Sequence, residues 1–369
     1  MRRSSWGGWG RKVVVALFFC FCWSASTGAV ELTSEDEKEI IFGRQVAEEI
    51  EGVGQRVGDP VVLARLAMLG KRLTPFLTRP LPFEFRCIVL SGDKRPNAFA
   101  LPGGIVYVTH SMLDFVRSDG ELAGVLAHEL IHTDRKHGMI QSARNSKLSL
   151  LSLLVMVASR GEIAAIILAN LAQIAILNNY SLDLEEEADR QGLEVLRKGG
   201  YDPAAMVTLL ERLEEERLKH PYLDPGIYQN HPDTMDRVEY LIQTLRDRKW
   251  PLYRKGPLRL LRIQGQQEGP WWKLRVDGDE VSRCSADALA SVDRQALVGA
   301  LDQTLQLELP PADLEVVPHP QGTFLRMGKE RLMTEPLPPG STSLADFREA
   351  LVRVLNGARR KHPLGQYLK

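Results

Sequence analysis

The stretch "SDGELAGVLAHELIH" (residues 118–132) contains the pattern H-E-x-x-H inside a segment with strong helix signals. Ser118 is followed three positions later by Glu121, which is a typical helix-capping pattern. A helix is therefore predicted to begin at Ser118, with Glu121 bonding back to the start, and to continue through both histidines.

A helical H-E-x-x-H has the geometry of a metal site. At 3.6 residues per turn, His128 and His132 project from one face, one turn apart, and can bind one ion through two imidazole nitrogens. Glu129 lies about 100° round the axis, where it can act as general base on a water molecule. The alternative interpretation is an amphipathic helix with incidental histidines, and a third ligand decides between the two.

The residues just after this pattern do not supply that ligand. The metzincin pattern requires a glycine three positions and a histidine six positions after His132, but Arg135 and Gly138 occupy those places. His137 follows His132 by five positions, so on a continuous helix it faces another direction. We expect His137 to be solvated.

An acidic cluster about fifty residues downstream is the better source of a third ligand. "YSLDLEEEADRQG" (Tyr180–Gly192) offers three glutamates, at positions 185, 186 and 187. Glu185 and Asp189 are four residues apart, so one helix face can present a metal ligand and a carboxylate that accepts a hydrogen bond from a ligand histidine. This relation favours Glu185.

The flanking sequence predicts a mainly helical fold with a small sheet. Helical spacing and a "TSED" cap predict a helix over Leu32–Glu51, and β-branched and aromatic residues predict strands over Pro82–Leu90 and Gly103–His110. The strand "GIVYVT" (residues 104–109) is expected to bind extended peptide by β-addition if it lies at the sheet edge.

Five segments, taken in order, resemble the zinc peptidase family of HtpX and the CAAX-prenyl endopeptidase, a gluzincin family. They are "NAFALPGGIVYVTHSML", "ELAGVLAHELIH", "EEEADRQG", "GGYDPAA" and "HPDTMDRV". The resemblance extends roughly over Leu32–Asp247 and is closest to the soluble periplasmic, BepA-like branch. It implies an α+β fold with a mainly helical zincin-type metallopeptidase domain and a small β-sheet.

The resemblance also implies roles for single residues. One zinc ion per chain would be bound by His128, His132 and Glu185, with Glu129 as the catalytic base. Asp189 would support a ligand histidine from behind, and the family's His-Pro motif with a later arginine corresponds to His231, Pro232 and Arg237. Gln229 and Asn230 depart from the Ser or Thr that commonly precedes His-Pro in the family.

The N-terminus predicts export. Basic residues, the apolar run "VVVALFFCFCW" (Val13–Trp23) and the small residues "SASTGA" have the order of a signal peptide ending at Ala29. Four basic residues and no acid occur in residues 1–29, so the remainder has a formal charge of −4. Nothing in this balance indicates a nucleic-acid partner. Cys87 and Cys284 would remain after cleavage and are predicted to be unpaired thiols.

The most apolar internal stretch is Leu148–Leu177. Arg160, Gly161 and Glu162 divide it into pieces shorter than the roughly 20 residues that span a bilayer. A buried helical hairpin, or one that touches the membrane surface peripherally, fits these lengths better than a pair of spans.

The domain organisation follows from these patterns: a signal peptide at 1–29, a metallopeptidase domain at 30–250, and a small α+β accessory domain at 257–369. The last contains a weak internal repeat, Leu274–Leu305 and Leu325–Ala358, with a hairpin-like and then a helical stretch in each. His319 and His362 have no paired ligand in the pattern and are predicted at the surface.

Two functions are consistent with the sequence. The first is an exported, periplasmic zinc endopeptidase that hydrolyses unfolded or misassembled envelope proteins, a substrate class implied by the resemblance. The second is a periplasmic chaperone or assembly factor with latent protease activity. His231 is predicted either to stabilise the transition state or to act as a fourth ligand that keeps the enzyme latent.

Overall fold

The computed structural model describes residues 31–90, 96–147, 149, 162–177, 180–219, 234–287 and 291–362. The predicted signal peptide, His231, and residues 148 and 150–161 of the apolar stretch lie outside the described residues. From Leu32 onward, the described residues belong to one compact unit.

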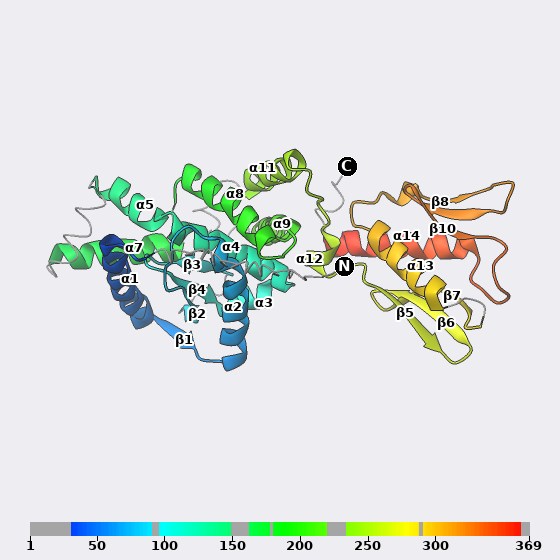
Figure 1. Cartoon of the computed structure of the whole chain (residues 1–369), viewed down its shortest axis with the longest axis horizontal. Helices are drawn as coiled ribbons and strands as arrows, with labels where there is room; N and C mark the ends of the chain where they lie inside the picture. Colours follow the sequence, from blue (N-terminus) through cyan, green and yellow to red (C-terminus); the bar gives the residue numbers. More distant parts are fainter. Residues whose placement is uncertain are drawn as a thin grey trace, which may run out of the picture. The chain divides into compact units, whose positions relative to one another are not determined.

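The first part of this unit is mainly helical (Figure 1). Its helices are α1 (Ser34–Val53), α2 (Pro60–Leu73), η1 (Thr74–Phe76), α3 (His110–Phe115), α4 (Asp119–Asp134), α5 (His137–Ser146), α7 (Glu162–Leu177), α8 (Leu182–Lys198), α9 (Ala204–Lys219) and α11 (Thr234–Asp247). Its strands are β1 (Gly54–Val57), β2 (Glu84–Leu90), β3 (Ala98–Ala100) and β4 (Ile105–Thr109). The α+β fold class predicted from the sequence, helical with a small sheet, is confirmed.

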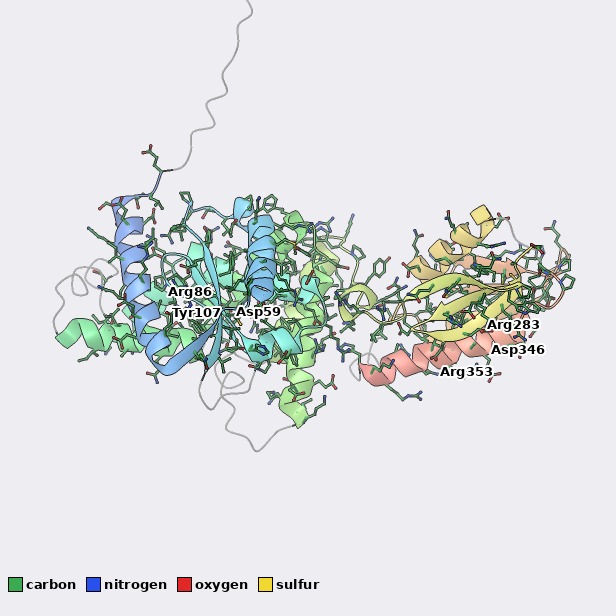
Figure 2. All side chains as sticks on the ribbon, turned by 90° about the horizontal axis from the view of Figure 1, so that it is seen from below. Asp59, Arg86, Tyr107, Arg283, Asp346 and Arg353 are labelled. Atoms are coloured by element: carbon green, nitrogen blue, oxygen red, sulfur yellow. The ribbon has the colours of Figure 1, made fainter. Side chains whose placement is uncertain are left out.

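The four strands form one sheet in the order β1-β2-β4-β3, with β2 and β4 parallel and the other pairs antiparallel. The two central strands share a polar contact: Arg86 of β2 donates a 3.0 Å hydrogen bond to the Tyr107 hydroxyl of β4, and both side chains bond to Glu51. Figure 2 shows Arg86 and Tyr107 close together on the sheet.

The predicted peptide-binding strand is not at the sheet edge. β4 pairs with β2 on one side and β3 on the other, so the expectation that residues 104–109 bind peptide by β-addition is wrong. Both faces of β4 are also buried: Val106 and Val108 pack in the core that includes α4, and Ile105 and Tyr107 pack in the core that includes α1. The edge position next to β4 belongs to β3.

The turn from β3 into β4 depends on glycine. Gly103 has a φ of +79°, and a Cβ atom there would lie 2.5 Å from the Ile40 Cα atom of α1. Only glycine allows both the left-handed backbone and this close approach. Glu39, also in α1, accepts a hydrogen bond from the Gly103 amide, so α1 and the turn are held together.

Helix α4 carries the H-E-x-x-H pattern through the interior of the protein. Ser118 caps it as predicted, accepting a hydrogen bond from the Glu121 amide. The Glu121 carboxylate is fully buried; it bonds back to the start of the helix at the Arg117 amide, one residue before Ser118, and also binds Arg212 and Thr208 of α9. Neighbouring α8, α9, α2 and β3 contact α4, and His128, Glu129 and His132 are buried among them.

The second half of the apolar stretch is α7, which packs against α1 and α5. Its Leu171 and Ala175 are buried with Phe42 and Val46 of α1. Within the ranges given above, none of the helices combines the length and apolar character needed to cross a membrane.

The second part of the unit begins after α12 (Lys255–Leu258) and consists of two successive three-stranded antiparallel sheets, each followed by a helix. The elements are β5 (Ile263–Glu268), β6 (Trp271–Val276), β7 (Asp279–Ser285), α13 (Ser291–Thr304), η2 (Pro311–Asp313), β8 (Leu314–Val317), β9 (Phe324–Met327), β10 (Glu330–Thr334) and α14 (Leu344–Lys361). Helix α14 contacts both sheets, and the two share one hydrophobic core.

The cysteines behave as predicted. Cys87 lies in β2 and Cys284 in β7, and both are buried free thiols. Burial raises the pKa of Cys87 to about 11, so this thiol stays protonated at neutral pH.

A buried ionic cluster connects α9 to two other segments, one just before the first C-terminal sheet and one at the end of α14. Arg254 is fully buried and donates hydrogen bonds of 2.6 to 3.0 Å to Glu211 and one of 3.1 Å to Glu308. His362 is also fully buried, with its Nε2 atom 3.1 Å from Glu211. The prediction of a surface His362 is wrong, because α14 delivers the residue to this acid; His319 is exposed as predicted.

Replacing Arg254 tests how strongly this cluster stabilises the fold. Arg254→Met leaves Glu211 buried without its main cation, which costs about 3–5 kcal/mol of unfolding free energy. We expect a clearly lower denaturant midpoint. Arg326→Met is the control, because its pair with Glu315 is about half exposed and contributes little. Equal midpoints for the two variants would contradict this account.

Candidate metal centre

Three side chains converge at the middle of α4. The Nε2 atoms of His128 and His132 lie 3.0 Å apart. Glu185 reaches them from α8, with carboxylate oxygens 3.6 Å from His128 Nε2 and 3.5 Å from His132 Nε2. All three residues are buried, and one ligand atom from each lies within 4.8 Å of the others.

This donor set fits zinc. Two imidazole nitrogens and one carboxylate oxygen are the protein ligands of many catalytic zinc sites, which leave a further position for water or substrate. The neighbouring Glu129 is also buried, and its Oε2 atom has no hydrogen-bond partner within the part of the chain that the structure describes. A buried carboxylate oxygen beside such a set is where a proton acceptor is needed.

Close packing of α8 on α4 brings Glu185 to the histidines. Glu185, Asp189 and Gly192 lie on one face of α8, and a Cβ atom at Gly192 would be only 3.3 Å from the His128 amide nitrogen. The other two glutamates of the cluster lie elsewhere: Glu186 pairs with Arg190 at the surface, and the partly exposed Glu187 lies beside His137 rather than beside His128 and His132. Of the three candidates, only Glu185 meets the histidines.

Asp189 supports His128 from behind. Its Oδ1 atom lies 2.8 Å from His128 Nδ1, and Arg237 of α11 donates two further hydrogen bonds of 2.8 Å to the same carboxylate. Arg237 also lies 3.4 Å from Glu185, and the Tyr240 hydroxyl donates to Asp189. Burial would raise the pKa of Asp189, but the Arg237 guanidinium and His128 hold it far below its usual range.

Tyr240 was not identified from the sequence. The available signal was its spacing: three residues after Arg237, it shares a helix face with the arginine. The predicted partner of that arginine in the His-Pro motif, His231, lies outside the described residues.

Glu129 is positioned as a proton acceptor. Burial raises its pKa to about 8, and the backbone of Ala100 in β3 forms a hydrogen bond with the carboxylate. The predicted base therefore lies between the metal-binding residues and the edge strand of the sheet.

His137 is not solvated, and that prediction is wrong. It is fully buried, with its Nδ1 atom 3.1 Å from His132 Nδ1 and its Nε2 atom 3.5 Å from Glu187. The prediction assumed a continuous helix, but α4 ends at Asp134 and Lys136 adopts a left-handed φ of +59°. Burial lowers the pKa of His137, against the opposing effect of Glu187.

The imidazole ring of His132 also packs against the aromatic ring of Tyr180. Tyr180 stacks on its imidazole with ring centroids 4.1 Å apart and an interplanar angle of 23°. Burial, and then the charges of Glu129 and Glu185, raise the pKa of Tyr180 well above its usual value. Tyr180 and His132 lie far apart in the sequence and meet only through tertiary folding, so no helical or strand spacing in the sequence predicts their contact.

The sequence profile of peptidase family M48 matches residues 61–245, about half of the chain and the part that contains this cluster. The chain belongs to peptidase family M48. The family predicted from the sequence is thereby confirmed, and with it the class of zinc-dependent peptidases.

Individual relatives agree. The chain is 30% identical to the beta-barrel assembly-enhancing protease of Escherichia coli (strain K12) over 206 residues, 53% of this chain and 41% of that protein. It is 34% identical to the mitochondrial metalloendopeptidase OMA1 of Schizosaccharomyces pombe over 122 residues, 33% of this chain and 36% of that protein. It is 28% identical to the metalloprotease LoiP of Escherichia coli (strain K12) over 155 residues, 40% of this chain and 58% of that protein. The chain thus spans about two fifths of the length of the assembly-enhancing protease.

Glutamine substitutions test the third ligand. Glu185→Gln should remove most bound zinc, because an amide is a much poorer zinc ligand than a carboxylate. Glu186→Gln is the matched control and should keep it. Asp189→Asn should weaken binding by about 10 to 100-fold, as is usual for a carboxylate behind a ligand histidine. Zinc content after dialysis against a chelator measures all three, and full zinc content in Glu185→Gln would contradict the assignment.

Proposed function

We propose that this protein is an exported zinc-dependent endopeptidase that hydrolyses peptide bonds of unfolded or misassembled envelope proteins. The observation that carries the proposal is the buried convergence of His128, His132 and Glu185 beside Glu129. We assign the first three as ligands of one zinc ion per chain and Glu129 as the catalytic base. Asp189 and Arg237 hold the ligand set in place.

The chemistry rests on Glu129. Bound zinc would supply a Lewis acid that polarises the peptide carbonyl and acidifies water. Glu129 takes a proton from the attacking water while the water oxygen bonds to the peptide carbonyl carbon. Glu129 then delivers this proton to the nitrogen of the departing amine. The burial that raises the pKa of Glu129 favours its holding the proton between the two steps.

We infer that extended substrate pairs with β3 rather than with β4. β3 is the outermost strand next to β4, and its Ala100 bonds to Glu129, so a peptide added along β3 would pass the proton acceptor. Main-chain pairing recognises extended chains with little sequence selectivity. That property suits a peptidase whose substrates share an unfolded state rather than a sequence.

The substrate class and location rest on similarity. The relative in Escherichia coli is named a beta-barrel assembly-enhancing protease, and the predicted signal peptide at residues 1–29 supports export to the periplasm. Peripheral contact of Leu148–Leu177 with a membrane surface is part of the same proposal. Residues 257–369 are proposed to form a separate α+β accessory domain.

Glu129→Gln tests the proposal. The variant should bind zinc normally but cleave an unfolded outer-membrane protein about 10² to 10⁴-fold more slowly, because the proton acceptor is lost. Glu186→Gln should cleave at the wild-type rate. Cleavage is followed by the appearance of peptide products. An unchanged rate in Glu129→Gln would refute its role as the base, and full complementation of a deletion phenotype by this variant would favour the chaperone function instead.

A second test concerns His231. We propose that it serves as a fourth zinc ligand that keeps the enzyme latent, so His231→Ala should cleave unfolded substrate faster than wild type at matched zinc occupancy. If His231 instead donates a hydrogen bond to the developing oxyanion, its removal costs about 2.7–4 kcal/mol of transition-state stabilisation. A fall in rate of 100-fold or more would therefore overturn latency.

A further inference from the structure

The two histidines of the cluster have different partners behind them. Both Nε2 atoms face each other and Glu185, so each Nδ1 atom points away. His128 Nδ1 lies 2.8 Å from the Asp189 carboxylate, whereas His132 Nδ1 lies 3.1 Å from another imidazole, that of His137. In the contact between His132 and His137, either imidazole could be the hydrogen-bond donor, so the direction of this bond has to be determined.

The direction of that hydrogen bond follows from the metal site. A histidine that binds a metal through Nε2 carries its proton on Nδ1. His132 must therefore donate to His137, and His137 must accept through an unprotonated Nδ1. The proton of a neutral His137 is then on Nε2, which lies 3.5 Å from Glu187. Glu187 is partly exposed and accepts a 2.8 Å hydrogen bond from Gln191.

The contact between His132 and His137 depends on an unfavourable backbone conformation at Lys136. Lys136, between α4 and α5, adopts a left-handed φ of +59°, a region that a non-glycine residue rarely occupies. The resulting turn places His137 at the first position of α5, directly behind His132. The Lys136 ammonium lies 3.5 Å from Glu35 and 3.6 Å from Glu39, which holds the turn to α1.

We propose that His137 is a positioning residue for the metal site: it accepts the Nδ1 proton of His132, fixes the tautomer and orientation of that ligand, and is itself backed by Glu187. This role rests on the proposed function, in which His132 binds zinc. Tyr180 holds the face of the same ring, so the two residues together leave His132 one orientation. A neutral acceptor polarises its donor less than a carboxylate does, so the effect should be smaller than that of Asp189.

The test compares two substitutions in the full chain. His137→Phe keeps the volume and removes the acceptor, whereas His137→Asn places an amide oxygen near the position of imidazole Nδ1. Zinc affinity is measured by competition with a chelator, and the visible spectrum of the cobalt-substituted protein reports ligand geometry. We expect His137→Phe to weaken zinc binding by about 10-fold and to change the cobalt spectrum. We expect His137→Asn to keep most of the wild-type zinc affinity and most of the wild-type cobalt spectrum.

Controls separate the possible failures. Glu186→Gln should match wild type in both measurements, and Glu187→Gln should change the affinity less than His137→Phe does. Wild-type affinity and spectrum in His137→Phe would overturn the positioning role while leaving the zinc site intact. Equal losses in His137→Phe and His137→Asn would overturn it as well, because they would indicate general packing. A wild-type chain that binds no zinc would overturn the proposed function and this role together.

Discussion

The bidentate ion pair between Asp189 and Arg237 is the interaction on which the site depends. Asp189, Glu185 and Glu129 are buried close together, and three carboxylates in one interior would repel each other strongly. Arg237 neutralises part of this charge by binding Asp189 and approaching Glu185 at once. Because the three helices α4, α8 and α11 contribute the charged groups, their mutual packing is tied to this compensation. A bound divalent cation would complete it.

Local patterns predicted the parts of the site that lie on single helices. The position of α4, its Ser118 cap and the i, i+4 pair on α8 depend only on helix geometry. The contacts of His137, Tyr180 and His362 are tertiary, and no spacing reveals them. His137 was misplaced for a definite reason: Lys136 ends the helix with a left-handed residue that is not glycine or asparagine, so the usual signal of a helix end is missing.

Sheet order was likewise beyond the reach of the sequence. Strand composition identified β2 and β4, but which strand lies at the edge depends on the short β3, only three residues long, inserting antiparallel beside β4. The same limit applies to the C-terminal part. Its hairpin and helix pattern was readable, whereas the buried contact of Arg254 and His362 with Glu211 brings together three segments that are distant in the chain.

The central claim is that one zinc ion binds between α4 and α8. A crystal structure of the zinc-loaded protein with anomalous diffraction at the zinc edge tests it most directly. The account predicts a single strong anomalous peak bonded to the Nε2 atoms of His128 and His132 and to the carboxylate of Glu185. A peak at other residues, or none in zinc-loaded crystals, would contradict it.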